Sequence, residues 1–588
     1  GGTAPKVTSN VAQRTLTSGQ TYEVRQLFNW TSDLSDVLAG FSFQEKVNGS
    51  NVHVGGRFPG AVDVSTSTVG VTVGVDRFWQ SFPKSIKVEG GSVKVGLWPE
   101  YGSGPQFGGQ YGTPTAPLPG VDAQSLNDYR FEGGRWKTHR MVFDFHASGA
   151  RTAAQTASFA ERVNAPIVGR ADPVKVRQSM ATGLLFVEDR DYWNFDSFKR
   201  YQRFVKIMGD DNEADSIATH GKVGLKKFLD SGCVNGGQQP YGWENYGDIP
   251  WADGYCDLHY DWPGSMLLGF LKTGHYGVYD RARDMAAFRR DYGQNHSTDA
   301  AEFWRGAQFY EKGWWHGNYS SGLNSHNWVL GLALNYVMFG DEASREAGLE
   351  NIAYVKRDPP KTWSGMWGSR IPGWAIDNLV HAHNFFGDAA ALTEAGLGVA
   401  RFRDLEVAGG MNGYHLNTGA NPPSTDPWMD NIFFIAACRY VIASGDTQYH
   451  PFLQRMRTWL KTSCTVIPTT TSLASANLPY VWYMWSPGAP NTASSHLCWP
   501  MIDALSHSAL LFNDAGDLAV ASVLFESMTR YWQRPALSGP VNALNTATYS
   551  PITMRATGYP TSESKALGNV LLWGGSHLFV RAYFDGTL

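Results

Sequence analysis

Hydrophobic and polar residues alternate along the first part of the chain, and this pattern changes to a helical period near residue 170. Up to about Asp144, short β-branched runs are separated by Gly- and Ser-rich turns; examples are residues 69–75, 85–88, 92–97 and 141–145. A period of two with frequent turns is typical of antiparallel sandwiches and barrels. We therefore predict a multidomain β + α chain, with a β-sandwich-type domain over residues 1–170, a joining segment over 171–241 and a helical domain over 242–588.

The helical part repeats one pattern five times. A short cluster mixing Trp with His, Asp or Asn is followed by an apolar helix and then by Gly or Gly-Asp; the clusters are at residues 259–262, 325–328, 374–378, 426–431 and 496–499. The spacing leaves room for two helices per unit, so each unit is predicted to be a helical hairpin.

Stacked hairpins of this kind can close into an (α/α)6 toroid, with the apolar helices as its inner ring. The inner helices should start near residues 262, 326, 375, 428 and 499, and residues 566–573 are a candidate sixth inner helix. The polar-aromatic clusters would then gather at one end of the ring.

Composition limits the ligands that such a ring could hold. The chain has 22 Trp, 26 Tyr and 31 Phe, 17% charged residues and a net charge of -4. Nucleic-acid binding is not expected, because phosphate neutralisation needs a basic surface. Sugars fit better, since their C–H faces stack on indole rings while their hydroxyls need polar partners. The alternative for any single Trp is that it only fills the core.

The cysteines indicate a secreted protein, extracellular or periplasmic. None of the five cysteines has metal-site spacing; Cys233 could pair with Cys256 and Cys464 with Cys498, which would leave Cys438 as a buried thiol in a helix. No apolar run reaches the roughly 18 residues that a membrane-spanning helix needs.

Several short segments, taken as an ordered set, resemble one known family. Residues 77–84, 95–99 and 133–139 are similar to the central β-sandwich of the exo-rhamnogalacturonan lyase family, and residues 242–248, 259–261 and 326–328 are similar to the start of its C-terminal α/α toroid. The resemblance covers about residues 75–450. It implies a polysaccharide lyase acting on a rhamnogalacturonan or gum-type polymer. The family has a further N-terminal barrel, whereas only about 75 residues precede the sandwich motifs here, which leaves the substrate open.

Elimination from a uronic-acid polysaccharide requires a base for the C5 proton, a donor for the leaving oxygen and a group that neutralises the uronate carboxylate. Toroidal lyases resemble one another in using a His and Tyr pair with an Asn or Arg. We assign Tyr260 as proton donor or base, His326 as its partner and Asn327 as neutraliser. The structural alternative is that His326 and Asn327 only cap a helix.

Further polar and aromatic residues of the clusters are candidates for substrate binding. They are Trp243, Glu244, Asp248, His259, Asp261, Trp315, His316, Trp428 and Asp430. No metal or other cofactor is expected, because His381 and His383 face different sides of a helix and the acidic residues near 210–215 lack the spacing of a calcium loop.

Two other functions stay open. An inverting glycosidase needs a carboxylic acid and a carboxylate about 6.5–9.5 Å apart, and Glu244, Asp248 or Asp261 could supply them, together with Asp377 or Asp430. The third possibility is a non-catalytic carbohydrate-binding protein.

Overall fold

The fold was analysed in a computed structural model of the chain. It describes residues 4–28, 41–99, 134–147, 149–189, 193, 195–209, 241–242, 246–248, 250–251, 254–255, 258–309, 324–362, 369–410, 412–415, 423–469, 479–487, 492–494, 498–531 and 563–588.

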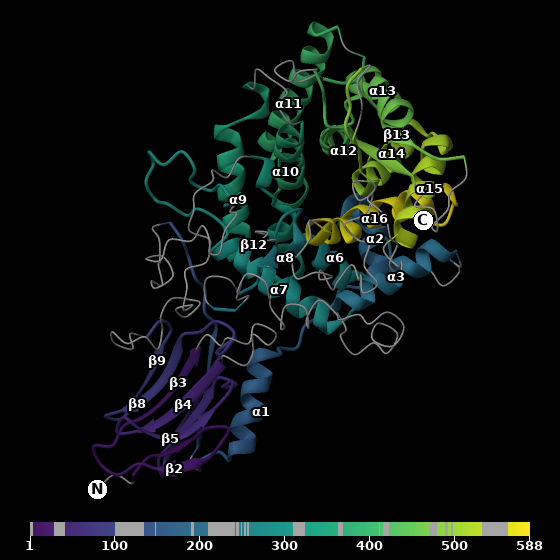
Figure 1. Ribbon diagram of the computed structural model, residues 1–588. Helices are drawn as coiled ribbons and strands as arrows, with labels where there is room; N and C mark the ends of the chain where they lie inside the picture. The colour runs from purple at the N-terminus through teal and green to yellow at the C-terminus, as the bar shows by residue number, and fades with distance from the viewer. Residues whose placement is uncertain are drawn as a thin grey trace.

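The N-terminal part contains two five-stranded antiparallel sheets (Figure 1). The first has the order β10-β7-β6-β1-β2, with β1 at Lys6–Thr8, β2 at Gln13–Thr15, β6 at Ala61–Ser65, β7 at Val69–Val75 and β10 at Met141–Ala147. The second has the order β5-β4-β3-β8-β9, with β3 at Tyr22–Phe28, β4 at Phe41–Val47, β5 at Ser50–Gly55, β8 at Lys84–Glu89 and β9 at Ser92–Gly96.

The alternating apolar residues of the two sheets share one core. Val62 and Val75 of the first sheet belong to the same buried cluster as Val24 and Ile86 of the second. This is the outcome expected when each strand turns every second side chain inward. The predicted antiparallel β structure is therefore confirmed.

Helix α1, Ala153–Asn164, packs on the first sheet. Its Phe159 and Val163 lie against β7 at Gly74, where an added Cβ would be 2.8 Å and 2.7 Å from their side chains. A glycine is therefore required at this position for the helix to approach the strand closely.

The helical part consists of hairpins, as predicted. The pairs are α6 (Trp262–Thr273) with α7 (Tyr276–Asp291), α8 (Leu330–Phe339) with α9 (Glu342–Arg357), α10 (Arg370–Phe386) with α11 (Ala389–Ala408), α12 (Pro427–Ser444) with α13 (His450–Trp459), and α14 (Cys498–Phe512) with α15 (Ala515–Tyr531). A further helix, α16, spans Glu563–Phe584. The helices begin close to the predicted starts.

The repeated Gly-Asp pair is a helix stop followed by a helix start. Gly340 and Gly387 adopt left-handed conformations at the ends of α8 and α10, and the aspartates after them accept hydrogen bonds from backbone N–H groups at the starts of α9 and α11. The fifth hairpin differs: Asn513 is the left-handed residue, with φ 50°, and Gly516 lies inside α15.

The apolar helices form a closed inner ring. Each of α6, α8, α10, α12, α14 and α16 contacts the next, and α16 contacts α6 again. The second helices of the hairpins lie outside this ring. The remaining outer place is taken by α3, Asp196–Gly209, which contacts α15 and α7 (Figure 1). The outer layer is therefore completed by a helix from the stretch predicted to be a joining segment, which the sequence pattern did not indicate.

Short β elements accompany the helices. The described strands after residue 249 are β11 (Pro250–Trp251) with β12 (Gly254–Tyr255), and β13 (Thr465–Val466), β14 (Tyr480–Met484) and β15 (Thr492–Ser494), and their pairing is antiparallel. Two short helices, α2 (Pro173–Gln178) and the 3₁₀ helix η2 (Gly183–Leu185), precede α3. The domain boundaries at residues 170 and 241 stay predictions.

The pairing of Cys464 with Cys498 is wrong. Both are free, fully buried thiols, and Cys438 is likewise free and buried within α12. Burial of small apolar groups in the helical core accounts for these cysteines without a disulfide. Cys233 and Cys256 lie outside the described residues. None of the described helices is both long and apolar enough to cross a membrane.

Candidate functional site

A tryptophan from every inner helix or its leading segment is buried in the ring. These residues are Trp262, Trp328, Trp374, Trp428, Trp499 and Trp573, and none is more than 4% exposed. Their indoles pack as core, so the simple core-filling interpretation describes them well. Trp428 lies under Arg370, whose Cζ is 5.3 Å from the ring centroid, and its substrate-binding role stays a prediction.

The segment before α6 has an unusual backbone. Leu258, Tyr260 and Asp261 have φ values of 50°, 69° and 53°, in the left-handed region that residues with a Cβ seldom adopt. Hydrogen bonds hold this conformation: Leu258 N–H donates to Asp248 Oδ1 over 2.9 Å, and Arg289 Nη2 donates to Leu258 O over 2.7 Å. Backbone strain of this kind concentrates at functional sites.

The strained segment places Tyr260 toward the middle of the inner ring. Its ring centroid is 6.3 Å from that of Trp328, 6.2 Å from Trp374 and 5.9 Å from Trp573. These partners come from the segment before α8, from α10 and from α16. Tyr260 therefore lies among residues from several inner helices, and it is 6% exposed.

Two histidines accompany this tyrosine. The His259 ring is 4.1 Å from the Tyr260 ring and 4.8 Å from the His326 ring, both edge-on. His326 ends the 3₁₀ helix Asn324–His326, and its Nδ1 is 2.7 Å from Ser325 Oγ. Tyr260 and His326 therefore lie at the same end of the ring, separated by one imidazole. We call His259, Tyr260 and His326 the His-Tyr cluster.

Asn327 has a structural function beside the cluster. Its Oδ1 accepts hydrogen bonds from Gln308 N–H at 2.7 Å and from Asn351 Nδ2 at 2.8 Å. Asn378 Nδ2 donates to its carbonyl oxygen at 2.8 Å. These bonds fix the segment that carries His326. Neutralisation of a substrate carboxylate by Asn327 stays a prediction.

The backbone N–H groups at the start of α8 have side-chain partners other than His326 and Asn327. The N–H of Val329, which precedes α8, donates to Asn378 Oδ1 at 3.0 Å, and Gly331 N–H donates to Asp261 Oδ2 at 2.9 Å. Side chains from neighbouring hairpins therefore satisfy these backbone donors.

The predicted carboxylates differ in environment. Asp248 and Asp261 are both 2% exposed, and each accepts backbone hydrogen bonds, which gives them local structural roles. Burial raises the pKa of Asp261, against the opposing charge of Arg289. Their contacts with substrate stay predictions.

Asp430 is a carboxyl group whose raised pKa suits it to act as an acid. Burial raises its pKa to about 7, although hydrogen bonds from Ser369 Oγ at 2.6 Å and Thr425 Oγ1 at 2.7 Å oppose the shift. Nearby Asp426, at the start of α12, also raises it. Asp430 is fully buried, so access to a substrate would require a local opening.

Sequence reasoning missed a buried ionic network between α10, α12 and α14. Arg439 donates to both oxygens of Asp377 at 2.9 Å and to Asp503 Oδ2 at 3.2 Å. His381 lies 3.3 Å from Asp377, and His507 lies 3.1 Å from Asp503. Arg439 and His381 hold the pKa of Asp377 below its usual range despite burial.

A signal for this network is present in the sequence. Asp377 and His381, and likewise Asp503 and His507, have the same four-residue separation on two inner helices, which places each pair on one helix face. Arg439, His381 and His507 also line a cavity of about 250 Å³, together with Gly183 and Leu185 of η2.

Trp243, Glu244, Trp315 and His316 lie outside the described residues, as does the acidic segment at 210–215. Within the described part of the chain, no group of three or more His, Cys, Asp or Glu side chains is arranged to hold a metal ion.

Comparisons with known proteins give only distant similarity. No family model matches the chain, and no curated protein matches it. Among solved structures, an unsaturated glucuronyl hydrolase specific for heparin has 10% identity and a TM-score of 0.40, covering 66% of this chain and 98% of its own.

Two further solved structures are similar to the same degree. A sugar epimerase from a ruminal bacterium has 9% identity and a TM-score of 0.42, covering 64% of this chain and 99% of its own. A polysaccharide lyase has 13% identity and a TM-score of 0.36, covering 56% and 91%. At these values the similarity does not assign an activity to this chain.

Proposed function

We propose that this chain is a secreted polysaccharide lyase that cleaves a uronic-acid polysaccharide, of rhamnogalacturonan or gum type, by β-elimination. In this proposal the two sheets form a β-sandwich, the helices form an (α/α)6 toroid, and the chain is related to the exo-rhamnogalacturonan lyases. The observation that carries the proposal is the His-Tyr cluster, which brings three groups able to exchange protons to one end of the inner ring.

The elimination needs two proton transfers, one from C5 of the uronate and one to the oxygen that leaves C4. His326 takes the proton from C5 of the uronate, the C4–O bond breaks as the C4–C5 double bond forms, and the Tyr260 hydroxyl gives its proton to the leaving oxygen. The two roles can also be exchanged between Tyr260 and His326. His259 lies between them and fixes their separation, since its ring contacts both.

Stabilisation of the uronate carboxylate requires a hydrogen-bond donor. In the side chain of Asn327 only the amide nitrogen can supply one, because Oδ1 is an acceptor and already receives two hydrogen bonds. We therefore propose that any neutralising contact from this residue comes from Nδ2, while Oδ1 positions the segment that carries His326.

Product absorbance and matched variants test the elimination. A panel of uronic-acid polysaccharides should include one whose cleavage gives the ultraviolet absorbance of a conjugated double bond. Tyr260→Phe and His326→Ala should each lower turnover by about 10²- to 10⁴-fold. Tyr336→Phe, on α8 but outside the cluster, is the control and should keep turnover. Saturated products from an active Tyr260→Phe enzyme would contradict elimination.

A second candidate function, inverting hydrolysis, is favoured by Asp430. A carboxyl group with a pKa of about 7 has the protonation that a general acid needs near neutral pH. Hydrolysis gives saturated products and should be lost in Asp430→Asn while Tyr260→Phe stays active. The same variants therefore separate the two functions.

A further inference from the structure

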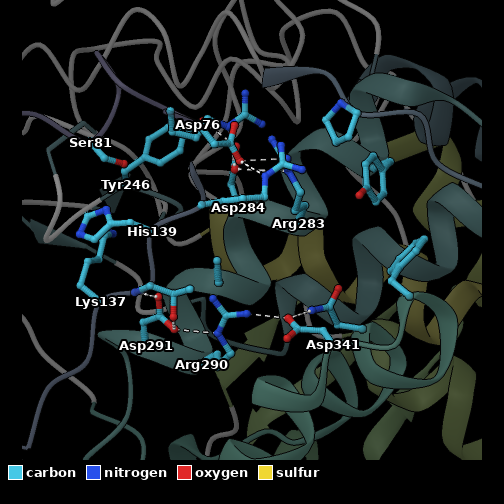
Figure 2. A pocket seen from close by; sticks show the side chains of 18 residues that line it. Asp76, Ser81, Lys137, His139, Tyr246, Arg283, Asp284, Arg290, Asp291 and Asp341 are labelled. Carbon is cyan, nitrogen blue, oxygen red and sulfur yellow. Dashed lines mark hydrogen bonds and ion pairs between the residues drawn. The ribbon is translucent and has the colours of Figure 1, made fainter. Parts of the chain in front are cut away.

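A second cavity lies where the β part meets the helical part, apart from the His-Tyr cluster. It has a volume of about 300 Å³, within the range of about 300–1,000 Å³ that is usual for small-ligand sites. Its walls come from the loop after β7, the segment before β10, and helices α7 and α8 with the start of α9. Figure 2 shows the charged side chains around it.

Two walls of the cavity are ion-pair clusters. In one, Arg283 lies 3.2 Å from Asp76, and Arg77 lies 3.0 Å from Asp284. In the other, Arg290 lies 2.7 Å from Asp291 and 2.6 Å from Asp341. In both clusters each aspartate forms an ion pair with an arginine (Figure 2). The clusters fix the shape of the cavity and hold guanidinium groups at its edge.

The third wall carries Lys137 and His139 (Figure 2). The pKa of His139 is lowered to about 3, first by burial and then by the charges of Lys84 and Lys137. The pKa of buried Lys84 is also lowered, by burial and by Lys137. Burial is the larger cause of both shifts, while the charge of Lys137 contributes to each and the charge of Asp291 opposes the shift of His139. The ammonium group of Lys137 on this wall of the cavity is therefore the feature that favours an anionic ligand.

The remaining lining is aromatic and apolar. The rings of Tyr279 and Phe339 are 5.1 Å apart, and Pro166 and Ala287 complete this side. The C–H face of a ligand can pack on this aromatic wall while an anionic substituent of the same ligand contacts the wall that carries Lys137. A sugar ring that carries a carboxylate has both features, whereas a neutral sugar lacks the charge and a simple oxyanion lacks the ring.

We propose that this interdomain cavity, between Lys137 on one side and Tyr279 and Phe339 on the other, binds one acidic sugar unit. The site is separate from the His-Tyr cluster, because the residues that line the cavity include none of the three members of the cluster. Arg289 donates to Leu258 O beside the cluster, and Arg290 pairs with Asp291 and Asp341 at the cavity. The proposal does not depend on the reaction that the cluster catalyses.

Calorimetric titration of the whole chain with glucuronate, glucose and inorganic sulfate tests the site. Glucuronate should bind saturably, more weakly as salt rises, while glucose should not bind and sulfate should bind less tightly. Lys137→Gln should weaken glucuronate binding about tenfold, as expected for one charge-assisted hydrogen bond. Lys137→Arg should retain most of the affinity.

The matched control is Lys175→Gln, an exposed lysine on α2 that should leave binding unchanged. Melting curves of each variant show whether it is folded, and Lys137→Arg keeps the test valid if Lys137→Gln is destabilised. Equal glucuronate affinity in wild type and a folded Lys137→Gln would overturn the proposal. So would glucose binding as tightly as glucuronate, or sulfate binding as tightly as glucuronate. Elimination activity is measured separately, so either proposal can fail alone.

Discussion

Asp430 shows how one residue's burial determines its chemistry. The side chain is fully buried at the start of α12, with two hydroxyl partners and no cation among the groups that shift its pKa. Desolvation therefore dominates, and the carboxyl group keeps its proton to about pH 7. Asp377 is equally buried, but Arg439 reverses the direction of its pKa shift.

The Asp430 shift predicts a dependence of stability on pH. Its pKa is about 7 in the fold against a usual 3.8, so the folded state binds the extra proton and stability falls as pH rises from about 4 to 7. Asp430→Asn should remove this loss and raise the free energy of unfolding at pH 8 by up to about 4 kcal/mol. Urea unfolding at several pH values measures it, with exposed Asp404→Asn as control. An identical pH profile in both variants would refute the assigned shift.

At the scale of elements, α6 and α8 approach each other through glycines. A Cβ on Gly331 would lie 2.6 Å from both Asp261 Oδ1 and Pro263 Cβ, and one on Gly264 would lie 3.2 Å from Gly331 N. The Asp261 carboxylate joins the two helix starts by accepting from the N–H groups of Gly264 and Gly331. This contact fixes the position of Asp261 and therefore of Tyr260, its neighbour in the chain.

Gly331→Ala should separate the starts of α6 and α8, because the added methyl group meets rigid neighbours. We expect a loss of about 1–3 kcal/mol in unfolding free energy. Turnover should also fall, because the substitution displaces Tyr260. Gly169→Ala is the control, since its Cβ would meet nothing within 4 Å. Chemical denaturation and activity assays measure both effects. A Gly331→Ala variant as stable as wild type would show that α6 and α8 have room for the added methyl group.

At the scale of the whole molecule, buried charges join the β part to the helical ring. Arg77 pairs with Asp280 at 2.5 Å and with Asp284 at 3.0 Å on α7, and Tyr246 donates to Asp284 at 2.5 Å. Arg135 lies 3.4 Å over the Phe309 ring. These contacts favour unfolding of the two parts as one unit.

Arg77→Ala should weaken this coupling, because it leaves the Asp284 carboxylate buried without its close arginine partner. Removing one member of a buried pair typically costs about 3–5 kcal/mol. The expected result is a lower unfolding midpoint and a denaturation curve with two steps. Arg403→Ala, at a surface pair with Asp404, should change little. A single step at an unchanged midpoint would contradict a coupling role for Arg77.

Local patterns explain what could be predicted from the sequence. Period-two runs predicted the antiparallel strands, and the Gly-Asp pairs predicted the hairpin turns, because both depend on neighbouring residues. The disulfide between Cys464 and Cys498 was wrong, since spacing does not reveal that both thiols fill the core. The outer position of α3 was missed because helix order in the sequence does not indicate which place a joining helix occupies.

The sequence alone therefore determined the antiparallel β part, the helical hairpins and the residues that lead into the inner helices. Hydrophobic period and capping residues act within a few positions of the chain, so they can be interpreted without a structure. Tertiary structure alone decided that His259 lies between Tyr260 and His326, that Arg439 joins two Asp-His pairs, and that Asp430 holds its proton. Such properties depend on distances and burial between segments far apart in sequence, which local patterns do not encode.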